Sequence, residues 1–293
     1  MPFRRILFPV DFSEAAMAMV PCVTEMAQRF NAAVTVLSAF DLVRGHILAP
    51  RLDGPCDSEP AAIPYTPALQ ELRKQRAQRL EEFSRAQFPH VSATARIEDG
   101  DPAAVIEWVV QRENTDVIMM PTKGLGRFRR ALLGSVTVKV LHDVGCPVLT
   151  SAHRPDPGLA SPPGYRSIIC AVELNGEADA VLKVAGLLAQ AYGASVCLLN
   201  IESASHEPGG EPFAQSLADA FDRAANAGGR GIGVNTTVRV LDGAIPEGIR
   251  RTAIDEKADL VVVGRGHQKG NLSRMWSHLY TIICESPCPV LSV

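Results

Sequence analysis

Residues 4–40 read RRILFPVDFSEAAMAMVPCVTEMAQRFNAAVTVLSAF, and residues 166–202 read RSIICAVELNGEADAVLKVAGLLAQAYGASVCLLNIE. Each stretch contains an apolar run, a short acidic turn, a segment with apolar residues at helical spacing and a second apolar run. Similarity of this kind at a distance along the chain indicates an internal repeat. Continuous apolar runs that alternate with amphipathic helices are typical of a parallel sheet covered on both faces, so the repeated unit predicts an α/β fold.

The similarity extends to the end of both copies. Residues 95–121 match residues 238–264 at a constant offset of 143, and GCPVLTS (145–151) matches PCPVLSV (287–293). The chain is therefore predicted to be a tandem duplication. The last strands, PVLTS and PVLSV, are short edge strands that are able to pair with each other, which would make the two halves an internal pseudo-dimer.

The duplication predicts two domains, residues 1–151 and 166–293, and a linker over residues 152–165 that is rich in proline and glycine. In the first domain we expect strands at 5–10, 33–40, 91–97, 116–120 and 147–150, and helices at 14–29, 67–88, 102–113 and 135–143. Each domain is thus predicted to be a five-stranded parallel-sheet α/β sandwich.

The helix expected at 102–113 carries two smaller predictions. Asp101 precedes Pro102 and is expected to cap the helix, with the proline at its first position. Trp108 is spaced with Val105 and Val109 along the helix and is expected in the core.

The composition argues against two classes of partner. The formal net charge is −3 and the isoelectric point is about 6.2, so no overall positive field would attract nucleic acid. The chain has no apolar stretch as long as a membrane span, and its first residues are too short an apolar run for a secretory signal, which favours a cytoplasmic protein without membrane contact. The seven cysteines are scattered through apolar segments, which favours buried thiols and gives no spacing typical of a metal site.

The topology of such a sheet predicts where a ligand would bind. In an open doubly wound sheet, ligands bind beyond the carboxyl ends of the strands, where the winding direction reverses. This rule selects the turns after the first and fourth strands, DFS (11–13) and PTKGLG (121–126). Gly134 and Ser135 then begin a helix, whose unpaired N–H groups favour an anion such as phosphate.

Two residues in these turns have more than one interpretation. Asp11 is placed to accept hydrogen bonds from the hydroxyls of a ribose, but an aspartate before a helix also serves as its cap. Gly124 would let the backbone pass close to a ligand, but it could also be a glycine of an ordinary turn.

Four features together resemble the universal stress protein family: PVDFS (9–13), the segment DGDP (99–102), the nine residues between Gly124 and Gly134 with Ser135 following, and CPVL near the end of the first copy. The duplication resembles the tandem-domain branch of that family. The resemblance implies a Rossmann-like fold of the adenine nucleotide alpha hydrolase type, a role in the stress response, and binding of ATP, AMP or another adenylate, with Mg²⁺ accompanying ATP.

In nucleotide-binding members, a Gly-x2-Gly-x9-Gly-Ser/Thr signature holds ATP. The contacts implied here are Asp11 for the ribose, Ala39 and Met120 for the adenine, Gly124, Gly134 and Ser135 for the phosphates, the backbone of Val136, and Ser13 and Lys123 as second contacts. Pro121 stands where the signature has its first glycine, and proline has no N–H to offer a ligand.

The second copy departs further from the signature. Glu173 replaces Asp11, and Trp276 falls where the first copy has Gly134, so that an indole would obstruct the phosphates. The second domain is therefore expected to be a structural partner of the first.

The sequence contains no Walker A loop, no Gly-x-Ser-x-Gly elbow and no His-Glu-x2-His helix, which favours a binding protein over an enzyme. Three functions stay open. The first is a regulatory protein with ATP in the first domain, whose binding alters partner choice or assembly. The second is a dimerising scaffold that binds no nucleotide, and the third and weakest is an enzyme acting on nucleotides. A homodimer of the whole chain is implied by the resemblance alone.

Overall fold

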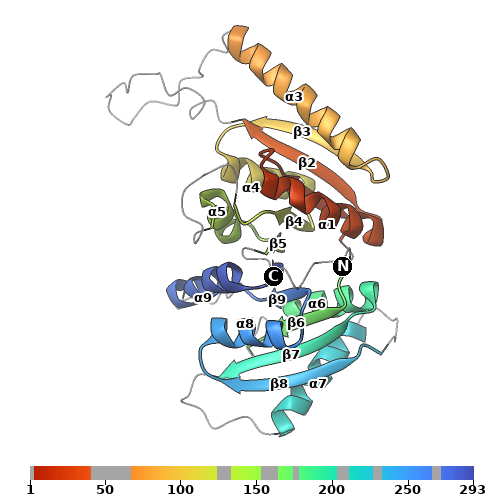
Figure 1. Ribbon diagram of the computed structural model, residues 1–293, viewed down its shortest axis with the longest axis vertical. Helices are drawn as coiled ribbons and strands as arrows, with labels where there is room; N and C mark the ends of the chain where they lie inside the picture. Colours follow the sequence, from red (N-terminus) through yellow and green to blue (C-terminus); the bar gives the residue numbers. More distant parts are fainter. Residues whose placement is uncertain are drawn as a thin grey trace.

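The computed structural model describes residues 3–40, 67–123, 133–152, 164–173, 178–202, 211–226, 233–265 and 272–293. Over these residues the chain forms one ten-stranded sheet in the order β3-β2-β1-β4-β5-β10-β9-β6-β7-β8. Figure 1 shows the two halves of the chain on either side of the junction between β5 and β10. The expected linker falls mostly on residues 153–163, which lie outside the described part.

The two halves contain the same elements in the same order. The first half has β1 (Arg5–Pro9), α1 (Glu14–Phe30), β2 (Ala33–Phe40), α3 (Pro67–Gln87), β3 (Ala93–Asp99), α4 (Pro102–Glu113), β4 (Val117–Met120), α5 (Ser135–Asp143) and β5 (Val148–Thr150). The second half has β6 (Ser167–Ala171), α6 (Ala178–Tyr192), β7 (Ser195–Glu202), α7 (Glu211–Asn226), β8 (Thr236–Asp242), α8 (Ile245–Asp255), β9 (Leu260–Val263), α9 (Leu272–Glu285) and β10 (Val290–Ser292).

The predicted α/β architecture is confirmed, with one shift at the edge of the sheet. The strand expected at 91–97 lies at Ala93–Asp99 instead. Val91 is used in a turn, where its N–H donates to the carbonyl of Phe88 at 3.3 Å, and the strand then pairs with β2 up to Asp99 opposite Phe40. The partner strand therefore sets the end of β3.

Side chains alternate along the strands between two helical layers. One core lies under α1, α3, α6 and α7, and the other under α4, α5, α8 and α9. In β1, for example, Ile6 and Phe8 belong to the first core and Leu7 to the second. Strands buried on both faces in this way need continuous apolar sequence, which explains the apolar runs of the repeat.

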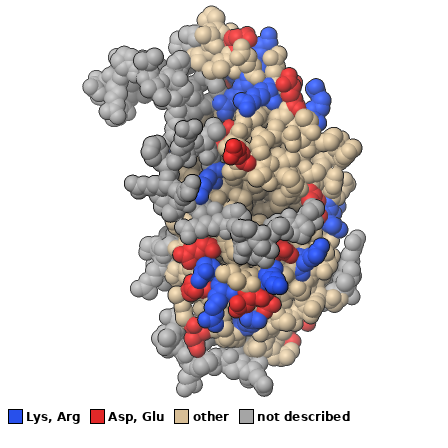
Figure 2. Space-filling model, viewed as in Figure 1, with Lys and Arg blue, Asp and Glu red and all other residues tan. Residues whose placement is uncertain are grey.

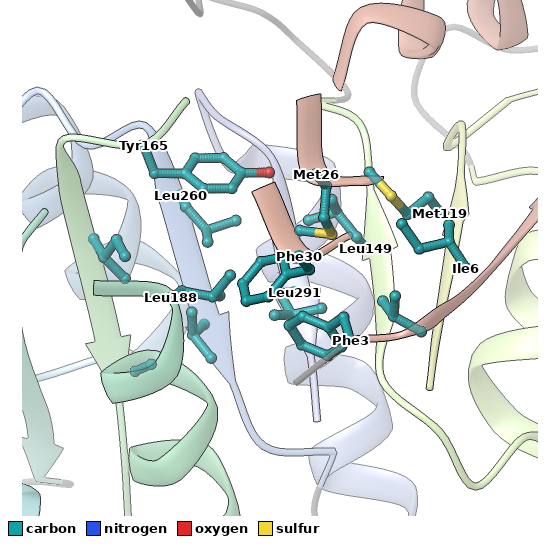
Figure 3. Packing of buried hydrophobic residues seen from close by; sticks show 14 of the residues in the cluster. Phe3, Ile6, Met26, Phe30, Met119, Leu149, Tyr165, Leu188, Leu260 and Leu291 are labelled. Atoms are coloured by element: carbon teal, nitrogen blue, oxygen red, sulfur yellow. The ribbon is translucent and has the colours of Figure 1, made fainter. Parts of the chain in front are cut away.

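The two halves join through their last strands. Leu149 of β5 lies opposite Leu291 of β10 in an antiparallel pair, whereas the neighbouring pairs of the sheet are parallel. Both leucines are fully buried (0% exposed), and Figure 3 shows them among Met26, Phe30 and Tyr165. The predicted pairing of the last strands is confirmed, and the two halves form an internal pseudo-dimer in which each of the two cores contains residues of both halves.

Trp108 corrects one prediction, because its side chain is 45% exposed and does not lie in the core. The buried residues of this part of α4 are Val105, Ile106, Val109 and Val110. The indole lies on the flank of that apolar stripe, where the guanidinium groups of Arg96 and Arg112 lie 5.0 Å and 5.3 Å from the ring centre. Stacking on two cations, rather than burial, accounts for the tryptophan.

Charged side chains of both signs are interspersed on the face of the molecule shown in Figure 2. This mixture agrees with the small net charge of the chain. A surface of this kind provides no broad field of one sign.

The start of α4 matches its prediction. Asp101 is the N-cap, and its carboxylate accepts hydrogen bonds from the N–H groups of Ala103 and Ala104 at 3.1 Å and 3.3 Å. Burial alone would raise the pKa of Asp101, but the hydrogen bond from Ala104 and the charge of Lys139, 3.5 Å away, lower it below its ordinary value of 3.8. The corresponding N-cap of α8 is Ala244, which has no side-chain cap.

These two caps give a reciprocal prediction. Asp101→Ala is expected to lower the free energy of unfolding by about 1 kcal/mol at pH 7, and Ala244→Asp to raise it by a similar amount, because a cap satisfies helix N–H groups. The folded pKa of Asp101 lies below its unfolded value, so its ionic contribution is complete above pH 3.8 and is lost as the pH falls through the folded pKa. Urea denaturation measures both variants; equal stability of Asp101→Ala and the wild type at pH 7 would contradict the assignment.

Candidate functional site

The structure brings the two predicted turns to the same edge of the sheet. β1 pairs in parallel with β4, with Ile6 opposite Val117 and Leu7 opposite Ile118. The chain proceeds from β1 to β2 on one side and from β4 to β5 on the other, so the winding direction reverses between β1 and β4. The carboxyl ends of these strands are therefore the topological switch point, the place where doubly wound folds have a ligand-binding crevice.

Asp11 occupies the turn after β1, and it does not cap α1. Its Oδ1 accepts a hydrogen bond from the N–H of Ser13 at 3.0 Å. The cap is Ser13, whose Oγ accepts from the N–H of Ala16 at 3.2 Å and whose side chain is 7% exposed. Asp11 itself is half-buried, and the turn positions its carboxylate ahead of the helix.

Helix α3 adds two arginines that the sequence did not suggest. Nε of Arg76 donates to Oγ of Ser38 at 3.1 Å, and the guanidinium of Arg79 lies 4.2 Å from the ring centre of Phe12. Burial and the neighbouring Arg79 lower the pKa of Arg76, and the negative charge of Asp11 opposes them. These arginines belong to a long charged helix without a motif, so only the fold could place them beside the crevice.

The turn after β4 is fixed by hydrogen bonds to α5. The carbonyl of Pro121 accepts from Oγ1 of Thr137 at 3.2 Å, and the N–H of Gly134 donates to the carbonyl of Thr122 at 2.8 Å. Gly134 is the N-cap of α5. Because its N–H already donates to Thr122, Gly134 has no N–H available for a phosphate. The predicted contact Gly124 lies in the segment 124–132, outside the described residues.

The N-terminus of α5 directs unpaired N–H groups toward the end of the helix that borders the turn after β4. The first intrahelical bond runs from the N–H of Val138 to the carbonyl of Gly134 at 3.0 Å. The N–H groups of Ser135, Val136 and Thr137 precede it, and helix geometry gives them no partner within the helix. The first turn carries no acidic residue, so the helix dipole there favours an anion.

Three of the other predicted contacts pack against one core. Ala39 at the end of β2 and Val136 are partly buried and pack against the same core as Met120, which is 4% exposed. Lys123 is half-buried directly after Thr122. Apolar surface and helix amides thus lie next to each other at one edge of the sheet.

Both ends of α5 are held by the second half of the chain. At its start, the N–H of Leu133 donates to the hydroxyl of Tyr280 at 3.3 Å. At its end, the guanidinium of Arg265 donates to the carbonyls of Leu141 and Val144 at 3.4 Å and 2.7 Å, and to that of Cys146. A cation at a helix C-terminus is favourable, and Arg265 is only 2% exposed.

No pattern in the sequence indicates this interdomain contact. Arg265 follows Gly264 after β9, and the aligned position in the first copy is Thr122. The first copy therefore suggests a small side chain at this position, whereas the second copy has the buried guanidinium of Arg265 there.

The second half has a hollow in the equivalent crevice, which was not anticipated. It has a volume of about 80 Å³ and lies where β6, β7 and β9 end. Its lining includes Glu173, Ile201, Val263, Gly264 and His278, which correspond to Asp11, Ala39, Met120, Pro121 and Val136 of the first half.

Other classes of site find little support in the described part of the chain. No cluster of His, Cys, Asp and Glu there is arranged to hold a metal ion. Six cysteines in that part carry free thiols. Among the described helices, none has the length and apolar character required to cross a membrane.

Comparison with known proteins agrees with the duplicated fold. The sequence profile of the universal stress protein family matches residues 2–151 and again residues 164–293. The "Universal stress protein in QAH/OAS sulfhydrylase 3'region" of Thermus aquaticus is 30% identical over 135 residues, which cover 44% of this chain and 98% of that relative.

One solved structure shares the architecture over nearly the whole chain. A universal stress protein from Archaeoglobus fulgidus DSM 4304 is similar with a TM-score of 0.69 and 20% identity, over 99% of this chain and 96% of its own. A universal stress protein solved in complex with cAMP is 24% identical and covers 44% of this chain and 97% of its own, with a TM-score of 0.37. On the strength of the two profile matches, the chain belongs to the universal stress protein family, as a member with two tandem domains.

Proposed function

We propose that this protein is a nucleotide-binding regulator of the stress response that holds ATP, or another adenylate, in the crevice between β1 and β4 of the first domain. The observation that carries the proposal is the meeting of two groups at that edge. The amides of Ser135, Val136 and Thr137 favour phosphate, and the carboxylate of Asp11 is an acceptor for ribose hydroxyls.

In this proposal the adenine lies against the apolar surface formed by Ala39, Met120 and Val136. Burial of a flat ring against apolar side chains stabilises binding without any charge. Ser13 is buried and acts as a helix cap, so we assign it to holding the turn around Asp11 in place. Lys123 and Gly124 are proposed to lie beside the phosphates.

Pro121 has a structural role in this proposal. It lacks an N–H, but its carbonyl accepts from Thr137 and so ties the end of β4 to the first turn of α5. The phosphate donors then come from the helix, with Gly134 as the small residue that keeps the approach open. Any Mg²⁺ would be bound by the phosphates of ATP.

We propose a binding protein in the cytoplasm rather than an enzyme. The free thiols of the described cysteines are consistent with a reducing compartment. The nucleotide would then act by altering partner choice or assembly.

Isothermal titration of the full chain with Mg-ATP tests this proposal. We expect saturable binding to one site per chain, and AMP should bind more weakly because it offers fewer phosphate oxygens to the helix. Asp11→Ala is expected to weaken ATP binding by about 10-fold or more, since a hydrogen bond to a charged group contributes about 1.5–3 kcal/mol.

The matched control is Glu173→Ala, which removes the corresponding carboxylate of the second domain and should leave ATP affinity unchanged. Absence of saturable heat with both ATP and AMP would reject the nucleotide proposal in favour of a dimerising scaffold. An equal loss of affinity in both alanine variants would reject the assignment to the first domain.

A further inference from the structure

The hollow of the second domain is a mainly apolar, partly open site rather than a copy of the first crevice. Most of its wall consists of buried apolar side chains, among them Val181, Leu199, Ile201, Ile249, Leu279 and Ile282. Its volume of about 80 Å³ compares with about 10–15 Å³ for one water molecule. The hollow therefore has room for a small organic group.

Two substitutions between the repeats make the site more apolar. Ile201 stands where the first domain has Ala39, so a larger alkyl side chain covers the end of β7. Leu279 stands where the first domain has Thr137, whose hydroxyl ties α5 to β4. Both changes replace a small or polar group with a branched apolar side chain.

The helix that would bind phosphate begins differently in the second domain. α9 begins at Leu272, whereas the residue aligned with the start of α5 is Ser277. The amides of Ser277, His278 and Leu279 are thus inside α9, where each donates to a carbonyl four residues earlier. The N–H groups aligned with those that favour an anion in the first domain therefore form hydrogen bonds within α9 and are not available to a ligand.

The charges around the hollow point to the same conclusion. The described lining contains no lysine or arginine, and Glu173 contributes a carboxylate at the exposed rim. Arg265 follows the lining residue Gly264, but its guanidinium is bonded to the carbonyls at the end of α5. The ionisable side chains among the described lining residues are therefore Glu173 and His278.

We propose that the second domain binds a small, uncharged and mainly apolar molecule in this hollow, with a hydrogen-bond donor of that molecule directed at the carboxylate of Glu173. A carboxylate only accepts hydrogen bonds, so an N–H or O–H group suits it and a second anion does not. Apolar pockets with few polar groups are the usual form of small-molecule sites. This site is separate from the ATP crevice and does not depend on it.

The probe for the experiment is indole, an apolar bicycle with one N–H donor, and its charged counterpart is indole-3-carboxylate. Methyl NMR of the full chain, labelled at isoleucine, reports where each compound binds. Indole is expected to shift the methyls of Ile201, Ile249 and Ile282 saturably. The methyls of Ile6 and Ile118 in the first domain should stay in place, and indole-3-carboxylate should bind about 10-fold more weakly.

Two variants on one helix separate filling of the hollow from loss of fold. Ala178→Leu adds three carbon atoms to the wall of the hollow and is expected to weaken indole binding by about 10-fold or more. Ala180→Leu makes the same change at an exposed position of α6 and should leave binding within about 2-fold.

Three results would overturn the proposal. They are the absence of saturable shifts at the lining methyls, equal effects of the two leucine variants, and saturable shifts of these methyls with Mg-ATP. Failure of the ATP proposal is read separately, from the methyls of the first domain in the Mg-ATP titration, so the two proposals are tested independently.

Discussion

Gly134→Trp is expected to abolish ATP binding, with a loss of affinity of about 100-fold or more. Gly134 is the N-cap of α5 and directly precedes the amides of Ser135 and Val136. An indole at this position would occupy the space in which the phosphates approach these amides, and charge-assisted hydrogen bonds are the strong contacts of such a site. About 2.8 kcal/mol of lost interaction corresponds to a 100-fold change in affinity. Isothermal titration with Mg-ATP measures it.

Gly134→Ala is the control for this variant. A Cβ at Gly134 would lie 3.5 Å from both the carbonyl oxygen of Thr122 and Oγ1 of Thr137, which is ordinary van der Waals contact. The alanine variant should therefore fold and retain ATP affinity within about 3-fold, although a poorer cap costs up to about 1 kcal/mol of stability. Wild-type ATP affinity in a folded Gly134→Trp variant would show that the phosphates do not approach α5.

The second domain already carries this change. Trp276 occupies the position aligned with Gly134, within the longer helix α9. The sequence predicted a degenerate second site from the bulk of that indole. The structure provides another reason, because the aligned amides are interior to the helix. That reason depends on the residue at which α9 begins. The identity of Trp276 alone could not reveal where the helix begins.

The elements of the fold could be predicted because burial leaves a direct signal in the sequence. Strands such as β4 and β9 are buried on both faces and read as uninterrupted apolar runs, VIMM and LVVV. The duplication supplied each element twice. Trp108 was misplaced because helical spacing indicates a face of α4 but not how far the neighbouring sheet extends under it.

The candidate site could be predicted only in its local parts. Asp11, Ser13 and Gly134 lie in turns whose position follows from the strands around them. Arg76 and Tyr280 reach their positions through contacts between distant elements, and charged or aromatic residues on helix surfaces carry no signal of such contacts. The hollow of the second domain likewise depends on how side chains from several elements leave space between them.

Arg265→Met is expected to destabilise the whole protein by about 2–4 kcal/mol. The guanidinium is buried and donates to three carbonyls at the end of α5, and a buried polar group left without its partner costs about 1–3 kcal/mol. Removal of a buried charge and of its unpartnered Nε recovers part of this cost, so the losses do not add fully. The change should lower the urea midpoint of unfolding, followed by circular dichroism.

Two further arginine variants separate the buried contact from the loss of a charge. Arg250 is partly exposed and pairs with Glu247 on α8, so Arg250→Met should change the free energy of unfolding by less than about 0.5 kcal/mol. Arg265→Lys keeps the charge but replaces the planar fork with a single ammonium, which cannot reproduce its geometry toward several carbonyls, and should give an intermediate loss. If Arg265→Met were as stable as the wild type, the carbonyls at the end of α5 would have to find other partners. Arg265 of the second domain would then contribute nothing to the stability of α5, the helix whose N-terminus is proposed to bind phosphate.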